Sequence, residues 1–216
     1  MAKNIKLVFL FLIFLTPLKS YSQNKAINFS HTTIINQDSI IKGETFSGKL
    51  GGIFISPFLG IEWPVKIFNT TSVNSLTYGL KLEFANIKLY PVILGAIYTY
   101  QNNTGKDEFL TKNLLNFLNT KITSFGITAD ILLNKYIKSN FTLPFLTLEL
   151  KYLKIQKEIS PTENTLNIIM NDNLMGITVG GGFTLHIFDI YGTYTFAKDY
   201  SSAGIKTRIH FPLIKF

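Results

Sequence analysis

The sequence predicts an all-β protein, an eight-stranded antiparallel up-and-down β-barrel whose strands cross a membrane. Apolar and polar residues alternate through residues 50–216, and because side chains of a strand point alternately to opposite faces, each run has one apolar face. The clearest runs are about 10 to 13 residues long, which suits a tilted strand in a bilayer better than a strand of a soluble protein. The chain is 46% hydrophobic, yet no stretch after residue 20 is long and apolar enough for a spanning helix.

Residues 1–22 read as a secretory signal peptide. Lys3 and Lys6 form a charged start, and Leu7–Leu15 form the short apolar stretch that such signals contain. Cleavage is expected after Ser22, where small residues occupy the positions that signal peptidase reads.

The expected barrel occupies residues 50–216, and residues 23–49 precede it. Its strands are expected at 51–61, 76–85, 88–100, 121–133, 142–155, 174–186, 190–197 and 205–216. Long polar connections alternate with short turns, which places the long connections outside the cell and both ends of the chain on the periplasmic side. Residues 23–49 are expected to form a periplasmic segment under the barrel; alternatively, they form a hairpin that raises the strand number to ten. A two-residue corner is expected at Phe188 and Asp189.

The composition excludes several kinds of function. There is no Cys, so a thiolate nucleophile, a disulfide framework and a Cys-based metal site are excluded. The formal net charge is +8, and every basic residue except Arg208 is Lys. These lysines are scattered, whereas a nucleic-acid-binding face would be clustered and supplied with Arg. We therefore expect no nucleic-acid partner, and nothing in the sequence points to a cofactor.

The residue types of a catalytic or metal site do not gather in this sequence. Of the three His residues, His186 and His210 share the expected inward parity but lie at different depths, and His31 lies before the barrel. No third ligand is evident, so no metal site is expected. Ser201 and Ser202 lie near the outer leaflet without a nearby His. We expect no enzyme, and a lipid-modifying enzyme of the outer membrane is the distant alternative.

The inward-facing charges are the most informative residues. An eight-stranded barrel encloses a lumen that side chains just fill, so charges inside it must pair. The expected interior charge cluster consists of Lys81, Glu83, Glu149, Lys151, Lys206 and Arg208. Glu149 and Arg208 are expected at similar depths and are predicted to pair across the lumen. The cluster is expected to be a structural plug or, alternatively, a gate.

Two strands add apolar residues to the expected lumen. Phe54 and Phe58 on the first strand and Ile93 and Ile97 on the third are inward candidates, although the third strand is apolar on both faces. They are expected to fill space or to line a cleft for a hydrophobic ligand. The run Gly180–Gly182 lacks the helix and Lys of a phosphate-binding loop, so it is read as a place where a strand curves or another side chain approaches closely.

The signal peptide, the alternation from Gly51 onward and the terminal strand ending in Phe216 together resemble the small outer-membrane barrel proteins of Gram-negative bacteria. The group that it resembles includes the eight-stranded outer-membrane protein A and X types, with the W type as the example of a hydrophobic cleft, and the composition is similar to Bacteroidota sequences. This resemblance implies contact with outer-membrane lipid and lipopolysaccharide, and a final strand with Phe216 that the barrel-assembly machinery reads. Every second residue back from Phe216 does not form a lipid-facing row, so a bulge is expected at Pro212.

Two functions follow from these expectations. In the first, the barrel is a structural or surface-interaction scaffold with a plugged interior, whose loops 62–75, 101–118 and 156–173 can meet an extracellular ligand. In the second, it is a narrow porin-like barrel or a transporter of hydrophobic small molecules. A soluble barrel of the lipocalin type is disfavoured, because the rows of Gly, Thr, Ser, Lys and Glu are too polar to form a soluble core.

Overall fold

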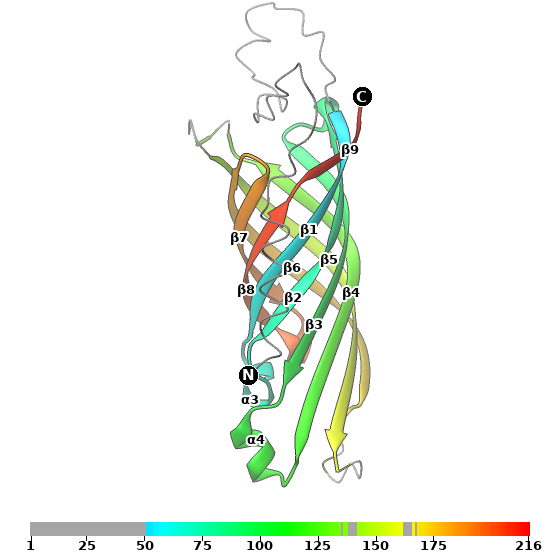
Figure 1. Cartoon of the computed structure of the whole chain (residues 1–216), viewed down its shortest axis with the longest axis vertical. Helices are drawn as coiled ribbons and strands as arrows, with labels where there is room; N and C mark the ends of the chain where they lie inside the picture. Colours follow the sequence, from blue (N-terminus) through cyan, green and yellow to red (C-terminus); the bar gives the residue numbers. More distant parts are fainter. Residues whose placement is uncertain (1–50, 135, 138–141, 162–165, 167) are drawn as a thin grey trace, which may run out of the picture.

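The structure is a computed structural model and describes residues 51–216, apart from 135, 138–141, 162–165 and 167. All strands of this part of the chain belong to one sheet, which closes into a barrel (Figure 1). The predicted signal peptide and the predicted segment or hairpin at 23–49 lie outside the described residues.

The barrel has eight antiparallel strands, as predicted. The strands are β1 (Gly51–Pro64), β2 (Ser75–Asn86), β3 (Val92–Thr104), β4 (Phe117–Leu132), β5 (Leu143–Ser160), β6 (Asn171–Leu185), β7 (Phe188–Phe196), β8 (Ser202–Ile209) and β9 (Phe211–Lys215). Neighbours in sequence pair from β1 to β8, and β1 closes the barrel by pairing also with β8 and β9. Thus β8 and β9 are two halves of one strand that is interrupted at His210.

The interruption has a partner in β1. Phe58 pairs with β8 and Ile55 pairs with β9, so the break lies opposite Ser56 and Pro57. Proline cannot donate a hydrogen bond to a ladder, and strands are irregular beside it. His210 lies at this break, and its ring contacts buried carboxylates inside the barrel.

A bulge lies next to Pro212, as predicted. Ile53 pairs with Ile214, but Phe54 pairs with Pro212, so Leu213 is an extra residue between the two pairs. The extra residue reverses the alternation of inward and outward side chains after Leu213, which explains why the last residues do not fit the pattern of one uninterrupted strand.

Phe216 lies one residue beyond β9 and continues its pairing. Its carbonyl oxygen accepts a hydrogen bond from the Gly51 N–H at 3.0 Å, and its own N–H donates to the Gly51 carbonyl at 3.2 Å. Its ring centroid lies 5.8 Å from that of Phe84 on β2. Phe216 therefore stabilises the strand pairing that closes the barrel, while its role as an assembly signal stays a prediction.

The connections are shorter than the predicted loops 62–75, 101–118 and 156–173. The structure reduces them to residues 65–74, 105–116 and 161–170, because β1, β3 and β5 run further and β4 and β6 begin earlier. In β3, β5 and β6 backbone pairing continues although the outward residues become polar, so the hydropathy alternation ends before the strand does. Short helices occupy the connections: α3 (Phe68–Thr71), α4 (Asp107–Lys112), η2 (Ile87–Leu89) and η3 (Lys198–Tyr200).

The corner between β6 and β7 lies at His186 and Ile187, so the prediction of a corner at Phe188 and Asp189 is wrong. His186 has a φ of 58°, a left-handed conformation that suits a tight turn. The shift by two residues moves Asp189 from a turn into β7, where it is fully buried.

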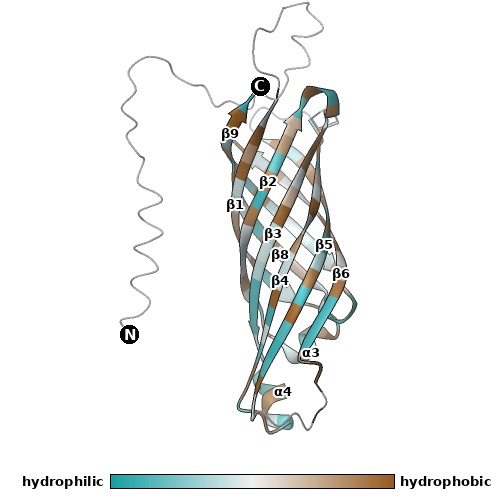
Figure 2. Cartoon of the chain, turned by 90° about the vertical axis from the view of Figure 1, so that its right-hand side faces the viewer, coloured by the Kyte–Doolittle hydropathy of each residue, from teal (hydrophilic) through white to brown (hydrophobic). Residues whose placement is uncertain are grey.

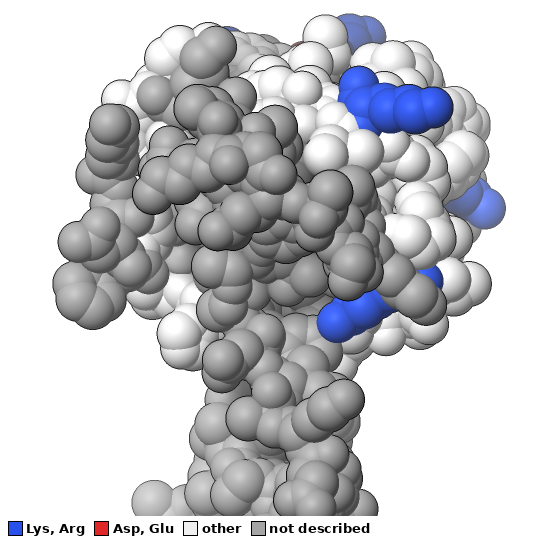
Figure 3. All heavy atoms as spheres, turned by 90° about the horizontal axis from the view of Figure 1, so that it is seen from above, with Lys and Arg blue, Asp and Glu red and all other residues white. Residues whose placement is uncertain are grey.

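The two ends of the barrel differ. The end with α3, α4 and η3, at the bottom of Figure 1, is called the long-loop end; the end with η2, the His186 corner and β9 is called the short-turn end. Figure 3 looks onto the short-turn end, where lysine side chains, drawn in blue, project at the rim.

The outside of the barrel is apolar at mid-strand and polar at the long-loop end (Figure 2). Its exposed residues include Leu80, Leu82, Ile127, Leu148, Leu150, Ile177 and Val179. β5 has 18 residues, about 60 Å of strand or about 45 Å of height at the usual tilt, against an apolar band of about 25 Å in such barrels. The strands therefore extend well beyond the apolar band. Of the described helices, none is long and apolar enough to cross a membrane.

Candidate functional site

The lumen holds a core of buried charges. All six residues of the predicted interior charge cluster point inside, and at most 4% of any of them is exposed. These are Lys81, Glu83, Glu149, Lys151, Lys206 and Arg208. Three more acids, Glu62, Asp130 and Asp189, are buried with them, so that the described lumen contains four basic and five acidic side chains.

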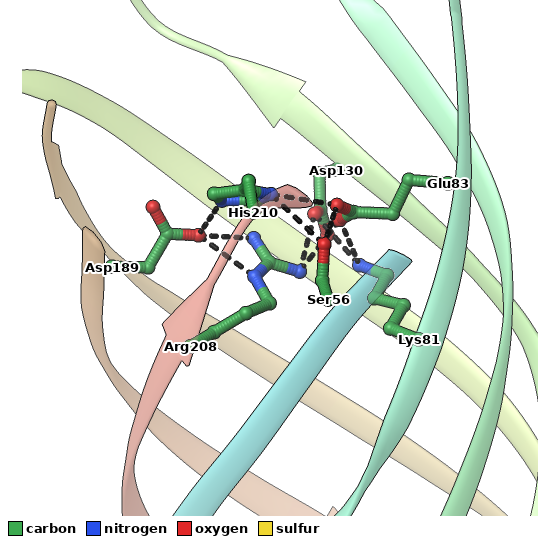
Figure 4. A network of polar contacts seen from close by, with 7 residues as sticks. All are labelled: Ser56, Lys81, Glu83, Asp130, Asp189, Arg208 and His210. Carbon is green, nitrogen blue, oxygen red and sulfur yellow. Dashed lines mark hydrogen bonds and ion pairs between the residues drawn. The ribbon is translucent and has the colours of Figure 1, made fainter. Parts of the chain in front are cut away.

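Arg208 is the centre of the larger group, which we call the Arg208 network (Figure 4). Its Nη1 lies 2.9 Å from Oε1 of Glu83 and 3.0 Å from Oδ2 of Asp130. Its Nε donates to Oδ2 of Asp189 at 2.8 Å, and Nη2 donates to the same oxygen. One guanidinium thus joins carboxylates from β2, β4 and β7, which is the kind of multiple donation for which Arg suits better than Lys.

Lys81 supplies the second cation of the network. Its ammonium donates to Oδ2 of Asp130 at 2.7 Å and lies 3.5 Å from Oε1 of Glu83. The Ser56 hydroxyl from β1 donates to Oε2 of Glu83 at 2.5 Å. Contacts around Glu83 therefore link four strands, β1, β2, β4 and β8, and β1 and β8 are the pair that closes the barrel.

His210, at the break between β8 and β9, bridges two carboxylates. Its Nδ1 lies 2.7 Å from Oε2 of Glu83, and its Nε2 lies 2.8 Å from Oδ2 of Asp189. A neutral imidazole carries a proton on only one nitrogen, so two carboxylate neighbours fit the doubly protonated, charged ring. With His210 charged, the described residues place five positive and five negative groups in the lumen, and their charges sum to zero.

A second pair of contacts lies nearer the long-loop end. Lys206 Nζ is 2.9 Å from Oε1 of Glu62, and Lys151 Nζ is 3.0 Å from Oε2 of Glu149. The predicted pair of Glu149 with Arg208 is therefore wrong. The reason is depth, because Arg208 pairs with residues nearer the short-turn end and Glu149 takes the Lys two residues along its own strand.

Aromatic rings and inward glycines shape the space around the charges. The guanidinium carbon of Arg208 lies 5.4 Å from the Phe145 ring centroid and 5.3 Å from that of Tyr191, close enough for a cation–π contact with each. Gly182 makes room for Tyr191, because a Cβ on it would lie 2.5 Å from the Tyr191 Cβ. The reading of Gly180–Gly182 as a place of close approach therefore agrees with the structure.

Apolar clusters lie above and below the charges. At the long-loop end, the cluster consists of Phe68, Ile122, Leu153, Ile155, Ala197 and Tyr200. Phe68 from α3 and Tyr200 from η3 meet edge to face with ring centroids 5.5 Å apart, so two connections fold over the lumen. Burial raises the pKa of Tyr200 to about 12, which keeps its phenol neutral beneath the Lys157 ammonium, 5.2 Å from the ring centroid.

The predicted apolar lumen residues fill space among these groups. Phe58 and Ile97 are buried, Ile93 packs against the short-turn cluster of Leu132, Phe145 and Tyr191, and Phe54 is partly exposed on the same inward row. The inward face of the third strand is thereby fixed. Lys206 lies 5.7 Å from the Phe58 ring centroid, so this ring packs against a charge instead of lining an apolar cleft.

Ser56, His210 and Asp189 lie in the order of a hydrolase triad, but their contacts do not fit one. The Ser56 Oγ is 3.1 Å from His210 Nδ1, while its proton goes to Glu83. Ser56 is also fully buried, so a substrate has no approach to its hydroxyl. Among the described residues, no group of three or more His, Asp or Glu side chains is arranged to hold a metal.

The sequence contained a signal for some of the missed site residues. Asp130 shares the inward parity of Ser124 and Thr128, so the alternation of β4 could have identified it. The sequence pattern predicts a loop at Glu62 and a corner at Asp189, and only the observed strand ends place these two residues inside.

No family model matches the chain, and no curated protein matches it. Three solved structures resemble it, and each match covers 74% of this chain. Neisserial surface protein A is 11% identical, with 97% of that chain covered and a TM-score of 0.49. The attachment invasion locus protein Ail of Yersinia pestis is 12% identical (99% of that chain covered, TM-score 0.43), and the N-terminal β-barrel domain of OprF from Pseudomonas aeruginosa is 10% identical (99% of that chain covered, TM-score 0.41). At these identities and TM-scores the likeness assigns no function to this chain.

Proposed function

We propose that this protein is an outer-membrane barrel of a Gram-negative bacterium that serves as a structural and surface-interaction scaffold, with a plugged interior and no enzymatic activity. The apolar outside supports a membrane location, since a soluble barrel would expose its polar rows and bury its apolar ones. A signal peptide cleaved near Ser22 would deliver the chain to the periplasm, and the barrel-assembly machinery would insert it, reading the strand that ends at Phe216.

The observation that carries the proposal is the filled lumen. Paired charges occupy its middle, and apolar clusters lie on both sides of them. An ion crossing the barrel would have to displace Arg208 or Lys206 from its carboxylates, which would leave buried charges unpaired. A narrow porin-like or hydrophobic-transport barrel is the alternative that this arrangement disfavours.

The scaffold presents its connections at the long-loop end. Residues 65–74, 105–116 and 161–170 would face the medium and meet an extracellular ligand, while the short turns would face the periplasm. Trypsin added to intact cells should cut near Lys106, just before α4, or near Lys112, its last residue, and should spare the turn at 134–140. Cutting only at that turn would show the reverse orientation.

Ion conductance tests the plug. The wild-type barrel in planar bilayers should show no steady conductance, whereas a variant with both Glu62→Ala and Lys206→Ala should conduct if the buried pair obstructs the lumen. The matched control removes the exposed pair Lys121–Glu158, whose Nζ–Oε1 distance is 2.6 Å, and should stay closed. Persistent channels formed by the wild-type monomer would contradict the scaffold proposal and support the porin-like alternative.

A further inference from the structure

The closing seam of the barrel, where β1 pairs with β8 and β9, lacks regular backbone pairing at one level. β1 pairs with β8 from Phe58 onward and with β9 up to Ile55. Between these two stretches, Ser56 and Pro57 have no ladder partner among the described residues of the last strand. His210, the residue between β8 and β9, lies at this level. Side chains therefore make the contacts that the backbone does not.

The His210 ring reaches strands on both sides of this gap. Its Nδ1 lies 2.7 Å from Oε2 of Glu83 on β2, and its Nε2 lies 2.8 Å from Oδ2 of Asp189 on β7 (Figure 4). Phe54 of β1 pairs with Glu83 on one side and with Pro212 of β9 on the other. The contact between His210 and Glu83 thus crosses the inner side of β1, and the ring joins β2 to β7 over the irregular part of the seam.

His210 is also the charged member of the Arg208 network that solvent reaches most easily. Its side chain is 21% exposed, whereas the side chains of the other charged members are at most 3% exposed. It lies next to β9, at the short-turn end, so a proton can be exchanged there without separating the buried ion pairs. Arg and Lys side chains ordinarily keep their charge where histidine titrates, so His210 is the cation of this network whose charge changes first.

The charges around the ring balance only while the ring is charged. The charged groups of the network that surround it are Lys81 and Glu83 on β2, Asp130 on β4, Asp189 on β7 and Arg208 on β8. With a charged ring, three carboxylates meet three cations. Loss of the proton leaves three carboxylates with two cations, and an uncompensated charge in a buried site is costly.

Loss of one proton also removes a donor from one of the two carboxylates. A neutral imidazole carries a single N–H, so either Glu83 or Asp189 would face a nitrogen lone pair. Asp189 keeps two donations from Arg208, whereas the contacts of Glu83 Oε2 within the described network are those with Ser56 and His210. The Ser56 Oγ lies 3.1 Å from Nδ1, so its hydroxyl can turn from Glu83 to the deprotonated nitrogen. The contact across β1 is then the one that is lost.

We propose that His210 is a pH-dependent switch of the closing seam. Its charged ring holds β2 and β7 together across the interrupted pairing of β1, and loss of the proton releases β9 from β2. The contribution of the charged ring is complete at low pH and disappears as the pH rises through the titration of His210. The seam therefore loosens on the alkaline side. The switch acts on barrel closure and does not depend on what the loops bind.

Urea unfolding of the purified mature protein in liposomes, from about pH 5 to about pH 9, tests the switch. His210→Gln keeps one donor but cannot become charged. At about pH 6, the folding equilibrium constant of the wild type should exceed that of His210→Gln about tenfold or more, the loss expected for one hydrogen bond between charged groups. The two proteins should converge on the alkaline side. His186→Gln is the matched control, because His186 is an exposed histidine of the neighbouring corner, and it should keep the wild-type pH profile.

Two further measurements separate a switch from a purely structural contact. Nitrogen NMR of the His210 imidazole should show two protonated ring nitrogens at about pH 6 and a single one on the alkaline side. His210→Lys carries a charge that persists to about pH 10, so it should stay stable where the wild type weakens.

Identical pH profiles of the wild type and His210→Gln would overturn the proposal. A ring that keeps one protonation state throughout the range would also contradict it, and so would a loss of the pH dependence in His186→Gln. If His210→Gln does not fold, the comparison of the wild type with His210→Lys decides. A lysine variant that weakens at alkaline pH as the wild type does means that His210 is not the group that titrates.

Discussion

Replacing Arg208 by Met should destabilise the barrel more than any other single change in the lumen. Met keeps most of the volume between Phe145 and Tyr191 but leaves Glu83, Asp130 and Asp189 with only two cations. Removing one partner of a buried ion pair costs about 3–5 kcal/mol. Arg208 serves three carboxylates, so we expect the free energy of unfolding to fall by about 4 kcal/mol or more.

A double-mutant cycle separates the true partner of Arg208 from a false one. Asp189→Asn combined with Arg208→Met should show a coupling of about 2 kcal/mol, because the two side chains share hydrogen bonds. Glu149→Gln combined with Arg208→Met should be additive within about 0.5 kcal/mol. Unfolding in urea can be followed in liposomes by the fluorescence of Trp63, the single Trp of the chain.

Two outcomes would refute this reasoning. A cost below about 1 kcal/mol for Arg208→Met would mean that water already solvates these carboxylates, and the lumen would be hydrated. Coupling to Glu149 but not to Asp189 would mean that the network is assembled differently from the one in Figure 4.

Further predictions concern the second charge pair, the packing and the closing seam. Glu149→Gln and Lys151→Met should each cost about 3 kcal/mol, but together much less than the sum, as measured by the same urea titrations; simple additivity would contradict the pair. Gly204→Ala should cost about 1–3 kcal/mol, because its Cβ would lie 2.8 Å from Cδ of Glu62; an unchanged urea midpoint would show that Glu62 moves aside freely. Deleting Phe216 should slow insertion and lower the yield of heat-modifiable barrel, and an unchanged yield would remove the assembly-signal prediction.

The sequence by itself determined the barrel, its strand number and the facing of most strands. Period-two alternation decides which side chains point inward, and six of the buried charges followed from parity alone. The bulge beside Pro212 also followed, because a parity conflict in one strand has few physical solutions.

Only the tertiary structure decided where strands end and which charges meet. Beyond the lipid boundary the outward residues become polar, so the hydropathy pattern vanishes while β3, β4, β5 and β6 stay paired. Pairing in the lumen depends on the relative depth of strands far apart in sequence, which parity does not encode. Arg208 therefore meets Glu83, Asp130 and Asp189, and Glu149 meets Lys151, because barrel closure sets the stagger of the strands.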